Sequence, residues 1–495
     1  MKHSIFSRKA PTWLPALSTA LCMTATPALA ADAAPAQESP QFDFGLSAGL
    51  TSFSMTNTHF GAGQLGANLS NDIARTELYL APRVNMTWKQ SDSSTVYGGL
   101  RGVTSMTRGD GDSYGKTVGE HWQFDGGGYQ LNGTPIPKVI GKNMSDTSLD
   151  WAYLGWKSGN LFPALGQDGL DLSFGRQDFQ LGDGMVLSDG TDEATQSKGL
   201  YWLGIARQAW NNTAIARINK GPFRAELFAL EASSDYGDDT ITGMNLEMAD
   251  AKLGKVGMSY FDVNASTHFD INRAAVPDRK GEYVFGVHGR GKPIASLPIL
   301  ELAGEYNQQK GGAANRNANA WFAEASLFMP FLPWYPTLGY RYASFSGDKA
   351  NTPGTNEGWD YLYYGYTQRG PGYWYQGIVV GTYETRPSNL NTHFVHLTLA
   401  PPIQGTWIKL QYYDYRFDQA STANSITGRS TLSDKFATEL DLILGYSPTK
   451  KADYLMIYGK AQPGEGGKNR YAGLPISKPI DLDATMLQFT MVVHF

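Results

Sequence analysis

The sequence predicts an all-β protein, a transmembrane antiparallel β-barrel of 18 strands with short periplasmic turns and long extracellular loops. Three observations predict this fold class. Apolar and polar residues alternate in repeated segments of about ten residues, a period typical of strands with one face in an apolar phase. The connections between these segments are of two kinds, short and long, as in outer-membrane barrels. No apolar run after the N-terminal region approaches the roughly 20 residues that a membrane helix needs.

Residues 1–30 have the pattern of a signal peptide. Lys2, Arg8 and Lys9 precede an apolar run, and Ala28-Leu29-Ala30 has the small residues of a cleavage site. We therefore expect export, cleavage after Ala30 and a location in the outer membrane of a Gram-negative cell. Residues 31–40 are rich in Ala, Pro and Gln and are expected to be disordered, and residues 41–495 are expected to form the barrel.

Charge and cysteine usage restrict the partners. The net charge of -5 becomes -8 when the three basic residues of the signal peptide are removed, and this mild acidity argues against nucleic acid as a partner. Cys22 is the only cysteine and should leave with the signal peptide, so no disulfide is expected. The expected partners are outer-membrane lipid and lipopolysaccharide, the barrel assembly machinery, and an anionic polysaccharide or small solutes.

Alternation marks 19 candidate strands, and because bacterial single-chain barrels have even strand numbers, we expect 18 strands and one wrong candidate. In chain order the candidates are residues 42–55, 76–89, 95–106, 149–157, 171–179, 213–219, 223–231, 241–249, 254–263, 282–290, 299–307, 320–329, 335–346, 372–382, 391–400, 406–417, 437–446, 454–461 and 483–495. Short turns are expected at 330–334 and 401–404. Long loops at 108–148 and 347–370 are expected at the extracellular end or folded into the lumen.

The last candidate strand has a wholly apolar face made by Leu487, Phe489, Met491, Val493 and Phe495. A face of this kind is expected where a strand meets lipid, and the terminal aromatic resembles the assembly signal of bacterial outer-membrane barrels. An edge strand of a soluble sandwich is the alternative interpretation.

The same alternation assigns charged side chains to the lumen, because a charge on the lipid face costs ~2–4 kcal/mol at the midplane. The cations placed inward are Arg83, Arg101, Arg224, Arg290, Arg341 and Lys409. The carboxylates placed inward are Glu226, Glu301, Glu305, Glu324, Glu439 and Asp441. These charges would either set the field of a pore or pair across adjacent strands.

The segment Phe174-Gly175-Arg176-Gln177-Asp178-Phe179 interrupts the alternation, because Arg176 shares the parity of the outward Phe174. A bulge at Gly175 would turn Arg176 into the lumen. This segment resembles the Gly-Arg-Gln segment of the alginate export family of outer-membrane barrels. Residues 359–364 running to Arg386-Pro387-Ser388-Asn389-Leu390, and residues 438–442, resemble the same family, so the resemblance covers the chain from about Leu149 to its end.

The resemblance implies an 18-stranded channel that passes an acidic exopolysaccharide along an arginine-lined conduit. It points to Arg176 first and to Arg386 second as substrate-binding residues. A general or small-solute porin, for sugars or carboxylates, remains the alternative, and a barrel enzyme is a third hypothesis.

No catalytic, cofactor or metal site is predicted. The sequence has no His-Glu-x-x-His or Gly-x-Ser-x-Gly motif, so we expect a protein that is not an enzyme. His393 and His396 are three residues apart in a strand and should lie on opposite faces, a poor arrangement for a metal. The Tyr and Trp residues of 359–375 are interpreted as a girdle at the membrane interface, with stacking on sugar rings as the alternative.

Overall fold

The computed structural model describes residues 39–61, 72–91, 94–110, 130–131, 134–135, 145–188, 190, 207, 209–233, 239–266, 279–349, 351–365, 370–374, 376–420, 433–471 and 480–495. The expected signal peptide and most of the segment 31–40 lie outside the described residues.

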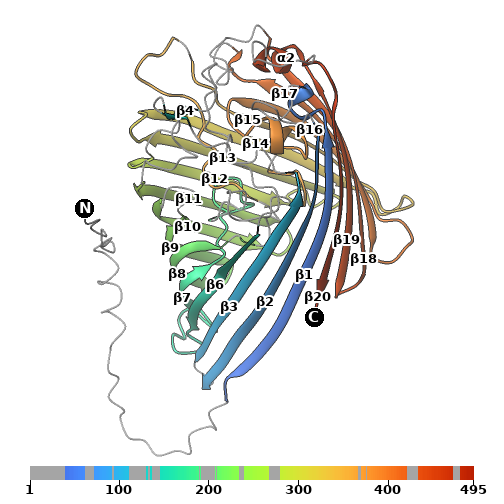
Figure 1. Ribbon diagram of the computed structural model, residues 1–495. Coiled ribbons are helices and arrows are strands. Elements are labelled where there is room, and N and C mark those ends of the chain that lie inside the picture. Colours follow the sequence, from blue (N-terminus) through green and yellow to red (C-terminus); the bar gives the residue numbers. More distant parts are fainter. Residues whose placement is uncertain are drawn as a thin grey trace, which may run out of the picture.

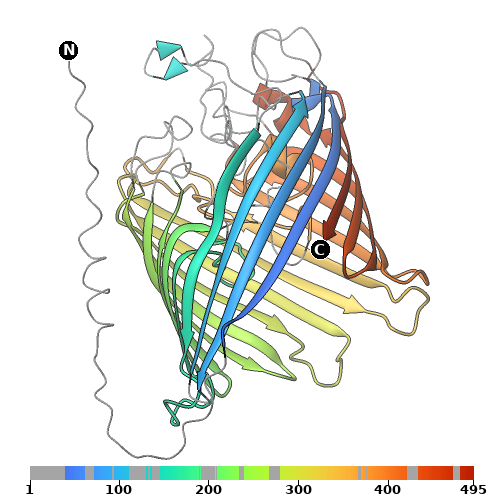
Figure 2. The same cartoon turned by 60° about the horizontal axis from the view of Figure 1, so that its bottom comes forward.

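Eighteen antiparallel strands form one closed sheet, which Figures 1 and 2 show as strands tilted around a ring. The predicted fold class and strand number are confirmed. In chain order the strands are β1 (Gln41–Thr56), β2 (Ile73–Ser91), β3 (Ser94–Gly109), β6 (Ser145–Lys157), β7 (Leu170–Gln177), β8 (Trp210–Lys220), β9 (Phe223–Glu231), β10 (Thr240–Asp250), β11 (Gly254–Ala265), β12 (Glu282–Gly291), β13 (Leu300–Gly311), β14 (Arg316–Phe328), β15 (Thr337–Phe345), β16 (Leu390–Leu399), β17 (Thr406–Phe417), β18 (Lys435–Thr449), β19 (Ala452–Pro463) and β20 (Ala484–His494).

The remaining elements are short and lie in connections. They are a two-stranded ribbon, β4 (Gln130–Leu131) with β5 (Thr134–Pro135), the 3-10 turn η2 (Thr58–Gly61), the π-helical turn η5 (Val380–Glu384) and the helix α2 (Glu465–Tyr471). None of the helices in the described part of the chain has the length and apolarity needed to cross a membrane.

The ring closes where the first strand meets the last. β1 pairs with β20 from Ser47 opposite His494 to Thr56 opposite Thr485. Beyond this ladder, the backbone N–H of Phe495 donates to the carbonyl of Leu46 at 2.9 Å, and the N–H of Leu46 donates back at 3.2 Å. Every strand of the sheet therefore has two neighbours, and the sheet has no free edge of the kind that promotes aggregation.

The strands have an apolar outer face and a polar, densely filled inner face. On β2, Leu78 and Leu80 are exposed, whereas Arg75, Glu77 and Tyr79, which have the opposite parity, are buried. Similar alternation recurs along the sheet because successive side chains of a strand point to opposite faces. The lumenal carboxylates predicted from parity are largely buried: Glu226, Glu305, Glu324, Glu439 and Asp441 are each at most 9% exposed.

The two ends of the barrel differ. One end has compact turns, such as residues 221–222 between β8 and β9 and residues 400–405 between β16 and β17, and β1 begins and β20 ends there. We call this the short-turn end. The opposite, long-loop end has the extended connections, the longest described one being residues 346–389 between β15 and β16.

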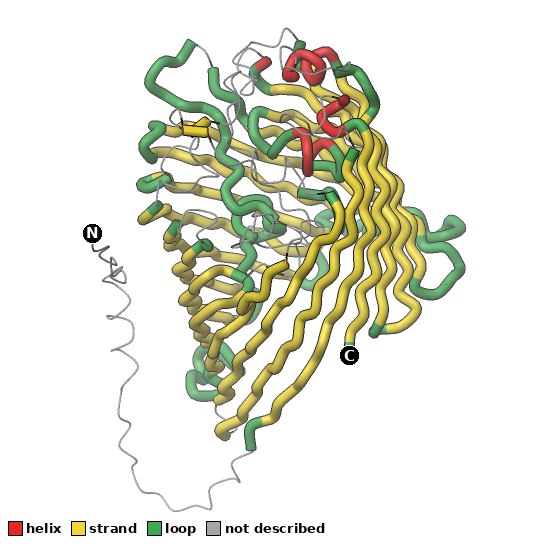
Figure 3. Tube along the Cα trace, viewed as in Figure 1, coloured by secondary structure: helices red, strands yellow, loops and turns green. Residues whose placement is uncertain are grey.

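One candidate strand, 372–382, is wrong. Its described residues form turns and η5 and belong to the connection 346–389. The girdle interpretation of the aromatic segment is also wrong, because Trp359, Tyr363, Tyr373 and Trp374 are buried rather than exposed on the outer face. Figure 3 shows loop segments lying within the ring of strands. The apolar residues of this connection pack against the inner wall.

Candidate functional site

Two connections fold into the barrel and pair with each other. We call the described residues of 346–389 the inner loop and residues 178–188 the companion segment. Tyr363 of the inner loop forms a parallel bridge with Leu187, donating its N–H to Val186 at 3.0 Å and accepting that of Ser188 at 2.8 Å. The indole N–H of Trp374 donates to the carbonyl of Asp183 at 2.7 Å. The inner loop and the companion segment therefore form a partition across part of the lumen.

A buried carboxylate on β18 fixes the far part of the inner loop. Glu439 is 1% exposed and accepts the backbone N–H groups of Ile378, Val379 and Val380 at 2.6, 2.7 and 2.7 Å. Tyr415 donates its hydroxyl to the same carboxylate at 3.0 Å. These bonds satisfy three backbone N–H groups that would otherwise be buried without an acceptor, so this contact holds the start of η5 against the wall.

An ionic network fixes the near part of the inner loop to the long-loop end. The Asp360 carboxylate accepts from Nε and Nη2 of Arg279 at 2.7 and 2.5 Å and lies 3.8 Å from Nη2 of Arg316. Burial disfavours its charged form, but the two guanidinium groups outweigh this and hold the pKa of Asp360 below its usual value. Arg279 also contacts Asp239 at 3.3 Å, and Arg316 pairs with Glu282 at 3.0 Å. Asp239, Arg279 and Asp360 lie in three connections, and Glu282 and Arg316 begin β12 and β14, so three connections and two strand ends meet at one buried charge cluster.

Two predicted site residues lie within this partition. Arg341 on β15 is fully buried, donates from Nη2 to the Tyr373 carbonyl at 3.0 Å, and has its guanidinium carbon 4.0 Å from the Tyr373 ring centroid. Arg386 donates from Nη1 to the Tyr364 hydroxyl at 2.5 Å and is 8% exposed. Both arginines contact the inner loop, and their burial limits what a solute could reach without loop movement.

Arg83 and Arg101 stand directly opposite each other on β2 and β3. Arg101 donates from Nε to Asp150 at 2.6 Å and lies 3.7 Å over the Trp151 ring. Arg83 is exposed and has the parity of the inward Tyr79, and its side chain covers the position of Gly45 on β1. Of the pair, Arg83 is the cation more open to solvent.

The remaining predicted cations lie apart from one another. A register shift follows Gly175, so the predicted bulge is present. The φ angle of Gly175 is 111°, a conformation that glycine adopts readily and other residues rarely do. Arg176 pairs with Ala152 in the ladder and donates to Asn211 at 2.7 Å. Arg224 on β9 is half-exposed and donates to Glu226 at 2.6 Å.

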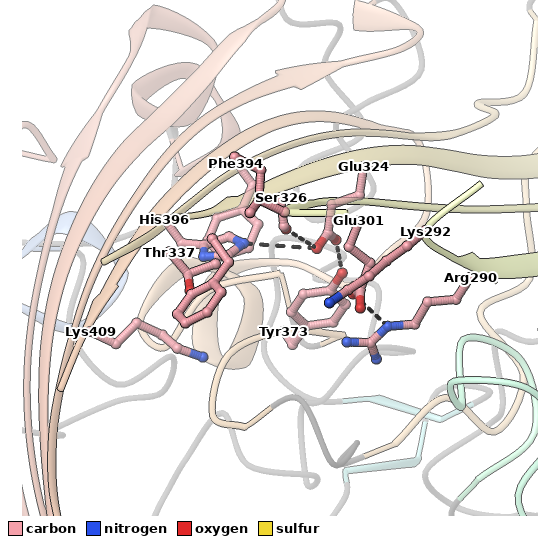
Figure 4. Close-up of a pocket in the computed structure, with 12 residues that line it drawn as sticks. Arg290, Lys292, Glu301, Glu324, Ser326, Thr337, Tyr373, Phe394, His396 and Lys409 are labelled. Carbon is pink, nitrogen blue, oxygen red and sulfur yellow. Dashed lines mark hydrogen bonds and ion pairs between the residues drawn. The ribbon is translucent and has the colours of Figure 1, made fainter. Parts of the chain in front are cut away.

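Lys409 lines a cavity of about 300 Å³ on the inner wall, which we call the wall pocket. Its charged lining is Arg290, Lys292, Glu301, Glu324 and Lys409. It lies toward the short-turn end, and Tyr373 of the inner loop contributes to its lining (Figure 4).

Sequence reasoning did not identify the residues that hold the partition. From the sequence, Asp360 is a carboxylate in a loop and Glu439 is a carboxylate on the inner face of a strand. Alternation does not predict which cation or which backbone N–H groups bind to either one. His396 was considered only as a metal ligand. Within the described residues, no cluster of three or more His, Cys, Asp or Glu side chains is arranged to hold a metal ion.

Comparison with known proteins agrees with the architecture. A family model described as alginate export matches residues 138–472. No curated protein matches the sequence. The crystal structure of the outer membrane protein OprD from Pseudomonas aeruginosa is similar in fold, with a TM-score of 0.51 at 9% identity over 91% of this chain and 94% of that chain. OccK5 (OpdH) of the same organism has a TM-score of 0.49 at 10% identity over 92% of this chain and 98% of that chain.

Proposed function

The chain belongs to the alginate export family, and on this premise we propose that it passes an anionic exopolysaccharide or a related acidic saccharide through a charged, arginine-containing lumen. It is an outer-membrane β-barrel, as its closed ring of 18 strands and apolar outer face require. The observation that carries the proposal is the combination of this family membership with a lumen that contains guanidinium groups beside aromatic rings, as at Arg101 and Trp151.

The physical argument concerns desolvation. An acidic saccharide that enters a narrow lumen loses part of its hydration, and fixed guanidinium groups replace it with charge-assisted hydrogen bonds. Carboxylates such as Asp150 and Glu226 neutralise several of these arginines, so each site is weak. Weak sites in series favour passage, because tight binding at one site would stop conduction.

A small-solute porin is the second candidate, and the partition favours it. The inner loop and the companion segment occupy part of the lumen with buried aromatic side chains, which leaves less room for a polymer. In this function the same lumenal arginines would select small carboxylates or acidic sugars.

The proposal includes the cellular context expected from the sequence. A cleaved signal peptide would export the chain, the barrel assembly machinery would insert it, and lipid with lipopolysaccharide would surround its outer face. The proposed function involves no chemical transformation of the saccharide.

Conductance in planar bilayers tests the proposal. Polygalacturonate should interrupt the current through the reconstituted full chain, and dextran of matched mass should not. Arg83→Gln should lower the rate of block about fivefold, since an exposed charge pair contributes roughly 1 kcal/mol. Arg416→Gln is the matched control, because Arg416 is paired with Asp414 and Asp434 near the long-loop end and has the parity opposite to the buried Tyr415. The proposal of an acidic saccharide would be contradicted if dextran blocked the current as strongly as polygalacturonate, or if Arg83→Gln and Arg416→Gln changed the rate of block equally.

A further inference from the structure

The wall pocket has the size of a site for one small ligand. Six neighbouring strands, β12 to β17, contribute to its lining, and Tyr373 reaches it from the inner loop. Its volume of about 300 Å³ is at the lower end of ligand pockets, which hold from one sugar ring to a drug-sized molecule. A polymer would not fit inside it, but a single residue would.

The charges of the pocket leave an excess of positive charge. Nε of Arg290 donates to Glu301 at 2.7 Å, and these two groups neutralise each other. Glu324 accepts the Tyr373 hydroxyl and that of Ser326, the latter at 3.3 Å. Lys292 and Lys409 add two ammonium groups, which Figure 4 shows on opposite sides of Tyr373. Three cations against two carboxylates favour a ligand with one negative charge.

Polar atoms around the pocket indicate a ligand with several hydroxyl groups. His396 stands 3.8 Å from Glu324, and its Nδ1 is buried with no hydrogen-bond partner among the described residues. Gln411 is opposite His396 in the β16–β17 ladder and is 1% exposed, and neither atom of its amide finds a partner in the described part of the chain. An unsatisfied buried polar group costs about 1–3 kcal/mol, and a hydroxyl can donate to one such group and accept from another.

The backbone opposite His396 makes room for its ring. A Cβ on Gly339, the residue paired with His396 on β15, would overlap the imidazole. The Phe394 ring lies 5.2 Å from that of His396 and 5.9 Å from that of Tyr373. Phe394 is 1% and Tyr373 4% exposed, so these rings form an apolar boundary of the cavity rather than open stacking faces.

We propose that the wall pocket binds a single hexuronate residue, with its carboxylate between Lys292 and Lys409, its ring against Phe394 and Tyr373, and its hydroxyls on Glu324 and His396. The assignment rests on the proposed function and deepens it by naming a subsite on the short-turn side of the partition. A polymer would present one residue at a time to this pocket, which would act as a binding subsite on the wall of the channel.

Calorimetric titration of the detergent-solubilised full chain tests the assignment with three probes: D-galacturonate, D-glucose and benzoate. Galacturonate should bind, and glucose and benzoate should bind at least tenfold more weakly, because one lacks the charge and the other lacks the hydroxyls. Lys409→Gln and Phe394→Leu should each weaken galacturonate at least tenfold. Lys310→Gln is the charge-matched control, because Lys310 lies near the long-loop end of β13 and faces Tyr283 in the ladder.

Each outcome separates this assignment from the proposed function, because polygalacturonate block is recorded independently in bilayers. Block without galacturonate binding overturns the wall pocket and leaves the channel function standing. Absence of block with binding intact overturns the channel function alone. If benzoate binds as tightly as galacturonate, the pocket is a site for simple carboxylates and the hexuronate assignment is overturned. Equal weakening by Lys310→Gln overturns the role of Lys409, and heat-modifiable migration on gels verifies that each variant is folded.

Discussion

Replacing Asp360 with Asn should release residues 359–364 of the inner loop from the wall. The Asp360 carboxylate holds Arg279, whose side chain is 2% exposed, through two hydrogen bonds. Removing one partner of a buried ion pair costs about 3–5 kcal/mol. Asp239, 3.3 Å from Arg279, recovers part of this loss, so we expect the lower end of that range.

A loss of about 3 kcal/mol raises the population of the released loop roughly 150-fold, at ~1.4 kcal/mol per factor of ten. Chymotrypsin measures this population, since Trp359, Tyr361, Tyr363 and Tyr364 are all buried in the closed loop. When the loop recloses faster than the protease cuts, the cleavage rate follows the open population. Cleavage within 359–364 should therefore accelerate by about two orders of magnitude, with the barrel itself remaining heat-modifiable and folded.

Glu357→Gln is the matched control, because it removes a carboxylate from the same loop at a solvated position. Glu357 accepts the Thr352 hydroxyl at 2.7 Å and makes its other contacts nearby in the loop. This variant should change cleavage by less than threefold. If Asp360→Asn and Glu357→Gln accelerate cleavage equally, or neither does, the charge cluster does not hold the inner loop and the reasoning is refuted.

Three further predictions concern other anchors and the assembly of the barrel. Glu439→Gln should raise single-channel noise, because the amide keeps one acceptor oxygen in place of two and leaves at least one of the three backbone N–H groups unsatisfied, at a cost of about 1–3 kcal/mol; unchanged noise would mean that this contact does not restrain η5. Because the pKa of Asp360 is lowered, its contribution is present above the unfolded-state value near 3.9 and is lost only as the pH falls through the lower folded value, so the difference in noise between the parent and Asp360→Asn should be the same at pH 7 and pH 5. Gly175→Ala should destabilise the barrel by about 1–2 kcal/mol in thermal unfolding, because φ is 111° and the new Cβ would overlap the carbonyl of Ala152; an unchanged midpoint would mean that the bulge relaxes freely.

The sheet was predictable from sequence because its two faces meet different solvents. Lipid outside and polar side chains inside impose a period of two, and 18 of the 19 candidate strands correspond to strands of the barrel. The failed candidate, 372–382, contains the run Ile378-Val379-Val380, which is β-branched but does not alternate. Such a run is typical of a segment that is buried on all sides. These three residues are at most 4% exposed and pack against the inner wall of the barrel.

The site was less predictable because its contacts cross large distances in sequence. Parity placed Arg341 and Glu439 inward, but it could not show that Arg341 is covered by Tyr373 or that Glu439 binds backbone N–H groups. Those contacts depend on where a long connection folds, and loop closure over tens of residues differs little in entropy between alternatives. The bulge at Gly175 was predictable, since an interrupted period and a glycine coincide there.

The seam between β1 and β20 has a consequence for the time course of folding. It joins residues such as Ser47 and His494, which are 447 positions apart, whereas every other ladder joins strands adjacent in the chain order of the barrel. Closing a flexible segment of that length costs roughly 5 kcal/mol in chain entropy, before any seam hydrogen bond compensates for it. Ladders between sequence neighbours should therefore form first and the seam last. Until then, β1 and β20 each have an unpaired edge in the same chain. The interval before closure is therefore the period in which the molecule is most prone to misassociation and most in need of a partner that pairs with these edges.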